Sequence, residues 1–111
     1  MTVAEIAARL GWGEFHMAES ERPVSGGYAG DLLSWVMGRA EQDCAWLTIM
    51  SNQNVAAVAL MADAACVVLT EGVAPDADLL RRAEEKGVNL LGTAEDTFTA
   101  AVRLGKALEE G

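Results

Sequence analysis

The chain has 111 residues, enough for one hydrophobic core and therefore for a single domain over residues 1–111. Hydrophobic residues make up 51% but aromatic residues only 5%, so Ala, Val, Leu, Ile and Met must build the core. The formal net charge of −9 opposes binding to nucleic acid or to an anionic membrane, because both need clustered Lys and Arg.

The first half of the chain predicts a helix, a brief strand, an acidic loop, a glycine-rich extended segment and a second helix. These are residues 3–10, 14–17, 18–22, 24–30 and 32–37. Thr2 and Glu5 have the spacing of a capping box, and Gly11 is a typical helix stop. Asp31 precedes the second helix, where a carboxylate is a favourable N-cap.

The second half alternates buried apolar runs of strand length with helices. The predicted strands are residues 45–50, 65–69 and 88–91, and the predicted helices are residues 55–62, 76–86 and a C-terminal helix after residues 93–96. One apolar stripe of the last helix contains Phe98, Ala101, Val102, Gly105 and Leu108. The alternation predicts a layered α/β domain with a mostly parallel sheet joined by right-handed crossovers.

Compartment and redox state follow from what the sequence contains. No apolar run approaches the roughly 18 residues that span a bilayer, and the first residues lack the basic region of a signal peptide, so we expect a cytoplasmic protein. Cys44 and Cys66 each begin an apolar run, and we expect buried, reduced thiols. With no C-x-x-C pair and one histidine, we expect no metal and no cofactor.

Local motifs give no catalytic residue. The opening helix resembles the first helix of a helix-turn-helix, but no basic recognition helix follows it. The glycine-rich segment opens a helix, yet it matches neither G-x-G-x-x-G nor the P-loop, and Asp31 would repel a phosphate there. We therefore interpret Gly26, Gly27, Gly30 and Asp31 as a structural turn. His16 and the serines form no nucleophilic arrangement.

Polar loops follow three of the predicted strands. In a parallel α/β sheet, ligands bind beyond the carboxyl ends of the strands, near helix N-termini. The predicted ligand-binding residues at that edge are Ser51, Asn52, Asn54, Thr70, Gly72 and Thr93. The alternative interpretation is that these polar residues only cap the helices that follow.

Two predicted helices, residues 32–37 and 55–62, are apolar around most of their circumference. One sheet can cover only one face of each, so the sequence predicts a homodimer that buries the remainder. The favoured interface is Leu32, Trp35, Val36 and Met37, because Trp35 supplies a large anchor. The alternative interface is Leu60 and Met61 on the second helix.

The stretch Glu21-Arg-Pro-Val-Ser-Gly-Gly-Tyr-Ala-Gly-Asp31 resembles the signature of the DRTGG domain, with Glu21 in place of Asp and three residues between Arg22 and the glycines. The resemblance continues through residues 32–38, 45–49, 54–59, 65–72 and 91–98 and so covers nearly the whole chain. It implies a fold similar to the N-terminal domain of HPr kinase/phosphorylase and, more distantly, of Mur ligases. The kinase's P-loop domain is absent, so kinase activity is not implied.

The resemblance also implies an accessory role. DRTGG domains occur beside phosphotransacetylase and within regulated pyrophosphatases, and stand-alone copies accompany iron-hydrogenase operons. We therefore expect a non-catalytic regulatory or ligand-binding module that senses a nucleotide or small phosphometabolite, with a protein partner in a hydrogenase or redox system. The alternatives are a purely structural protein–protein interaction domain and an enzyme acting on a small anionic metabolite.

Overall fold

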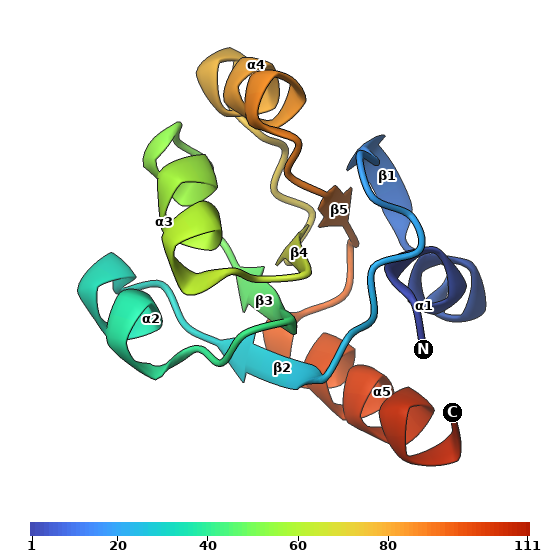
Figure 1. Cartoon of the computed structure of the whole chain (residues 1–111). Helices are drawn as coiled ribbons and strands as arrows, with labels where there is room; N and C mark the ends of the chain where they lie inside the picture. Colours follow the sequence, from blue (N-terminus) through green and yellow to red (C-terminus); the bar gives the residue numbers. More distant parts are fainter.

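The computed structural model describes all 111 residues and contains a five-stranded sheet in the order β1-β5-β4-β3-β2 (Figure 1). The strands are β1 (Gly13–His16), β2 (Gly26–Ala29), β3 (Cys44–Thr48), β4 (Cys66–Leu69) and β5 (Leu90–Gly92). The helices are α1 (Val3–Leu10), α2 (Leu33–Arg39), α3 (Asn54–Ala62), α4 (Ala77–Lys86) and α5 (Thr97–Glu110). Strands β2 to β5 are parallel, and only β1 is antiparallel to its neighbour, β5.

The sheet separates two hydrophobic cores. Helices α1 and α5 pack on one face and α2, α3 and α4 on the other, as Figure 1 shows. Alternation along β3 sends Ala45 and Leu47 to the first face and Cys44 and Trp46 to the second. The predicted α/β class is therefore confirmed, with a helix between each pair of successive parallel strands.

The predicted role of Asp31 as an N-cap is wrong. Leu32 occupies the N-cap of α2 and makes no side-chain capping bond. The Asp31 carboxylate instead accepts hydrogen bonds from the Thr48 hydroxyl at 2.8 Å and from the backbone N–H of Ile49 at 2.9 Å. Because β2 and β3 are neighbours, Asp31, which follows β2, lies beside the end of β3, and its hydrogen bonds link the two strands.

The glycine-rich segment is mainly a strand. Gly26 and Gly27 lie within β2, while Gly30 and Asp31 form the connection to α2. The side chain of Leu104 lies over Gly27 so closely that an added Cβ would be 2.8 Å from its Cδ2 atom. Gly27 is therefore the point at which α5 reaches the sheet.

The apolar stripe predicted for the C-terminal helix is not the side that faces the sheet. The buried residues of α5 are Ala100, Leu104 and Ala107, whereas Phe98 is 79% exposed and Val102 is 40% exposed. Two adjacent rows of α5 carry small or apolar residues. The buried row is the one that contains Leu104, which packs on Gly27 of β2. The other row is partly buried at Ala101 and Leu108 and exposed at Val102 and Gly105.

Helix α2 also leaves apolar side chains in solvent. Val36 is fully buried in the core of its own chain, so it is not available to a partner. Leu32, Trp35 and Met37 are exposed, and the guanidinium of Arg39 stacks on the Trp35 ring at 3.6 Å from its centroid. The exposed apolar surface of α2 thus consists of three side chains instead of the predicted four.

Both cysteines are buried with free thiols. Cys44 packs with the α2–α4 core and Cys66 with the α1–α5 core, so their side chains lie on opposite faces of two neighbouring strands. No helix of the structure combines the length and the hydropathy that crossing a bilayer requires. No group of three or more potential ligand side chains is arranged to hold a metal ion.

Candidate ligand-binding site

The structure brings the three polar loops together at the carboxyl edge of the sheet. The N–H of Gly72 donates to the carbonyl of Thr93 at 3.0 Å, and the N–H of Asp76 donates to the carbonyl of Ser51 at 2.9 Å. These bonds join the loop after β4 to the loops after β3 and β5. The carboxyl-edge geometry that the sequence suggested is therefore present in the backbone.

The hydroxyl groups at this edge are used within the chain. Thr70 is fully buried, and its hydroxyl shares a hydrogen bond of 2.6 Å with the Thr97 hydroxyl. The Thr93 Oγ1 atom accepts from the N–H of Glu95 at 3.1 Å and lies 3.3 Å from the Glu95 carboxylate. The Asn52 side-chain oxygen accepts from the N–H of the residue two positions later. These groups stabilise the loops, whereas the N-cap residues of α3, α4 and α5 are Gln53, Asp76 and Asp96.

Carboxylates also line this edge. Glu71 accepts from the N–H of Thr97 at 2.9 Å. Glu95 accepts from the indole N–H of Trp12 at 2.9 Å and pairs with Arg103, and these contacts lower the pKa of the Glu95 carboxyl. Negative charge held so close to the loops repels an anionic ligand from the centre of the edge.

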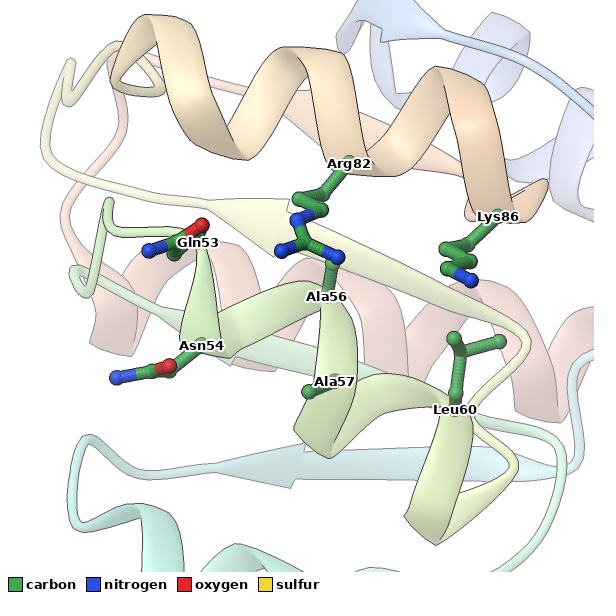
Figure 2. A pocket seen from close by; sticks show the side chains of 7 residues that line it. All are labelled: Gln53, Asn54, Ala56, Ala57, Leu60, Arg82 and Lys86. Atoms are coloured by element: carbon green, nitrogen blue, oxygen red, sulfur yellow. The ribbon is translucent and has the colours of Figure 1, made fainter.

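A groove of about 240 Å³ lies beside this edge, between α3 and α4. Figure 2 shows Arg82 and Lys86 reaching from α4 toward α3, with Arg82 near Ala56 and Lys86 near Leu60. The groove is lined by Gln53, Asn54, Ala56, Ala57, Leu60, Arg82 and Lys86. It combines an apolar floor with two cations and two side-chain amides.

The two cations of the groove have no acidic partner. Neither Arg82 nor Lys86 takes part in any ion pair of the structure, whereas the adjacent Arg81 pairs with Asp78 and Glu85 on the same helix. Residues four apart on a helix lie on one row, and like charges at that spacing repel each other. In a chain of net charge −9, an unpaired cation pair facing one groove favours an anion as its counter-ion.

The backbone at the start of α3 contributes little to this site. The N–H of Asn54 is bonded to the Asn52 side chain, and the N–H groups of Val55 and Ala56 are bonded to the carbonyls of Asn52 and Gln53. The first amides of the helix are therefore occupied. Recognition in the groove depends on side chains.

Of the six predicted ligand-binding residues, Asn54 lines the groove, and the other five lie in the loops of the carboxyl edge. Gln53, Arg82 and Lys86 were missed by sequence reasoning. A signal existed in the sequence, namely a like-charge pair at i, i+4 on an otherwise amphipathic helix. Whether this pair faces α3 depends on the orientation of α4, and only the fold determines that orientation.

Comparison with known proteins agrees with this architecture. The profile of the DRTGG domain matches residues 32–107, which run from the start of α2 into α5. A search of curated proteins gave no significant match. Among solved structures, the chain is similar to the CBS and DRTGG domains of the regulatory region of Clostridium perfringens pyrophosphatase, complexed with its activator diadenosine tetraphosphate.

The likeness to that structure has a TM-score of 0.74 at 14% sequence identity. It covers 93% of this chain but 45% of the other, so this chain spans less than half the length of the regulatory region. At this identity the likeness establishes a shared fold. The matched profile begins after the Glu21–Asp31 stretch, so the family match is carried by α2 to α5 and the strands between them.

Proposed function

Because the chain belongs to the DRTGG domain family, we propose that it is a non-catalytic regulatory module that binds an anionic small ligand. The proposed ligand is a nucleotide or small phosphometabolite, and its phosphate lies between Arg82 and Lys86 in the α3–α4 groove. The observation that carries this proposal is the unpaired cation pair, because it is charge that the fold itself does not neutralise.

The size of the groove limits what it encloses. A volume of about 240 Å³ is below the roughly 300–1,000 Å³ of pockets that bury a drug-sized ligand. A phosphate and part of a sugar fit between the helices, and the remainder of a nucleotide lies along the adjacent surface. Gln53 and Asn54 offer amide donors and acceptors at the end of the groove nearest the carboxyl edge.

The pyrophosphatase regulatory region supports the choice of ligand class, because a dinucleotide is its activator. A regulatory module that binds a phosphorylated metabolite needs no catalytic group of its own. The family resemblance is likewise what supports a partner in hydrogenase or redox metabolism. The proposed partner would respond to the ligand-bound state of this domain.

Isothermal titration calorimetry with diadenosine tetraphosphate, ATP, AMP and inorganic phosphate tests the proposal. At about 100 times the Kd, a bound ligand raises the free energy of unfolding by about 2.7 kcal/mol, which a thermal shift also detects. Arg82→Gln and Lys86→Gln each remove one charge-assisted contact, and we expect each to weaken binding about 10-fold.

Arg81→Gln is the matched control, because Arg81 lies on the same helix but is paired with Asp78 and Glu85. It should leave the affinity unchanged. Binding that is equally affected by all three substitutions would contradict the groove as the site. A folded protein that responds to none of the ligands would favour a structural interaction domain, and turnover of a ligand would favour an enzyme acting on an anionic metabolite.

We also propose that the chain is a homodimer, as its exposed apolar helices suggest. Trp35 on α2 is 51% exposed, and Leu60 and Met61 on α3 are exposed as well. Exposed apolar side chains of this kind are typical of an interface, and a two-fold dimer is the commonest way to cover them. Light scattering across micromolar concentrations tests the oligomeric state.

A further inference from the structure

Strand β2 forms one margin of the sheet and has a partner on one side only. It pairs with β3, and its other edge is free of any strand (Figure 1). Its sequence is Gly-Gly-Tyr-Ala, without an acidic or basic side chain and without proline. Exposed edge strands in monomeric proteins carry charged side chains or proline, which prevent pairing with another chain.

The opposite margin of the sheet is protected. Strand β1 carries Glu14 and His16, and its register with β5 shifts between these two residues. A charged side chain and an irregular register both discourage further pairing. The contrast singles out β2 as the edge that is open to another strand.

Helix α5 presents a mostly apolar flank along the open edge, on which the exposed Glu109 lies one turn beyond Gly105. With Leu104 facing the sheet, Ala101, Gly105 and Leu108 lie on the side of the helix that borders β2, where they form an apolar groove of about 310 Å³. The charged residues Arg103 and Glu110 lie on the other flank, where they face α1. The apolar row of α5 that the sheet does not bury thus lies beside the free strand.

Gly105 has no explanation within the single chain. It lies in the interior of α5 and is exposed, and no atom lies within 4 Å of the position that an added Cβ would take. Glycine is unfavourable in a helix interior relative to alanine. A second backbone approaching this point accounts for a glycine that the monomer does not need.

On the other face of the sheet, α2 contributes apolar side chains to the same margin. Trp35 and Met37 lie about 100° to either side of the buried Val36 around the helix axis. Helix α3 flanks α2 on one side only, so one of these two exposed side chains faces the open margin. An apolar side chain of α2 therefore lies at this margin, on the face of the sheet opposite α5.

We propose that two copies of this chain associate about a two-fold axis at β2, with the two β2 strands paired antiparallel and α5 packed against α5 of the second copy. The inference rests on the proposed homodimer and places its axis at β2 and α5 instead of at α2 alone. The two sheets become one continuous sheet. The edge of a strand is self-complementary under a two-fold axis, because each strand offers the other the same alternation of donors and acceptors.

Charge and area both favour a second copy as the occupant. Two chains of net charge −9 repel each other over most of their surface, whereas neither β2 nor any residue that lines the β2–α5 groove carries a charge. Helix α5 is about 21 Å long, and the molecule is 25 Å across its shorter axes. A flat face of these dimensions is about 500 Å² on each copy, so two copies bury about 1,000 Å² in total, which is the lower limit for a specific interface.

Sedimentation of the wild type and of Gly105→Glu tests the proposal. An added Cβ at Gly105 meets no atom within 4 Å, and the position is exposed, so the monomer keeps its fold, but two carboxylates would meet at the axis. We expect the Kd of the dimer to rise about 30-fold or more, as for loss of a central contact. Leu60→Glu on α3 is the matched control and should leave the Kd unchanged. Amide exchange of residues 26–29 should be slower in the dimer than in the diluted protein.

The outcomes separate this inference from the homodimer on which it rests. A wild type that is monomeric at all accessible concentrations overturns both. A dimer that is dissociated by Trp35→Glu or Leu60→Glu but not by Gly105→Glu overturns the β2–α5 axis and keeps the homodimer. Loss of the dimer in Gly105→Glu together with an unfolding midpoint that is unchanged or raised at high dilution supports the axis.

Discussion

The Nη2 atom of Arg22 donates to both the backbone oxygen of Asp63 at 2.8 Å and its carboxylate at 2.7 Å. The same guanidinium donates to the Asp43 carboxylate at 3.0 and 3.1 Å. Both aspartates have positive φ, Asp63 at the end of α3 and Asp43 before β3. The arginine of the signature-like stretch therefore fixes two tight turns at one end of the sheet.

Arg22→Ala should destabilise the fold by about 2 kcal/mol, because it leaves two carboxylates and a carbonyl without their donor. The loss is limited because the Asp63 side chain is 53% exposed and water replaces part of the bond. Arg22→Lys should recover only part of the loss, since an ammonium cannot reproduce the planar fork. Urea unfolding measures both, and a loss below about 0.5 kcal/mol for Arg22→Ala would contradict the role.

The Cys66 thiol should make stability depend on pH in the alkaline range. Complete burial raises the pKa of Cys66 from 9.0 to about 12. Above pH 9 the unfolded chain releases a proton that the folded chain retains, so the unfolded state is favoured and stability falls. The contribution is intact below pH 9 and is lost between pH 9 and 12 at about 1.4 kcal/mol per pH unit.

Unfolding curves at pH 8 to 11 measure this loss, and Cys66→Ala is the control because it removes the titrating group. A pH dependence that is identical in the variant would assign the effect to another group. At pH 8 a thiol reagent should react with Cys66 only through unfolding, because the native thiol is buried and protonated.

Asp31 and Thr48 should behave as one unit. The carboxylate accepts from the Thr48 hydroxyl and from the N–H of Ile49, so Asp31→Ala should cost about 1–2 kcal/mol of stability. Thr48→Val removes one of the two donors and should cost less. In a double-mutant cycle the two losses should not add, whereas an Asp31 that acted only as a helix cap would give independent effects.

The sequence predicts the fold well where burial is complete. Residues 44–48 and 66–69 are buried without exception, and a strand buried on both faces is recognisable as a continuous apolar run. Strand β1 is exposed along most of its length, and its antiparallel pairing joins Gly13 to Gly92. That pairing is a long-range choice that the local pattern does not contain.

The functional surfaces were harder to predict because they depend on which row of a helix faces inward. Helix α5 carries two rows of small or apolar residues, and Gly27, distant in the sequence, decides which row meets the sheet. Similarly, Arg82 and Lys86 form a site only because α3 is the neighbour of α4 on that side. Sequence periodicity gives the rows of a helix but not their orientation.

The contact between Gly27 and Leu104 gives the last prediction. A methyl group on Gly27 would lie 2.8 Å from the Leu104 Cδ2 atom, and Leu104 is buried, so Gly27→Ala should cost about 1–2 kcal/mol through overpacking. Leu104→Ala alone should cost about 2–5 kcal/mol because it leaves a cavity. In the double variant the new methyl group occupies part of that cavity, so the combined loss should be smaller than the sum by about 1 kcal/mol. Urea unfolding of the four proteins of the cycle measures the coupling. Strictly additive losses would mean that α5 does not seat on β2 through this pair, and the position of the apolar flank beside the β2 edge would lose its support.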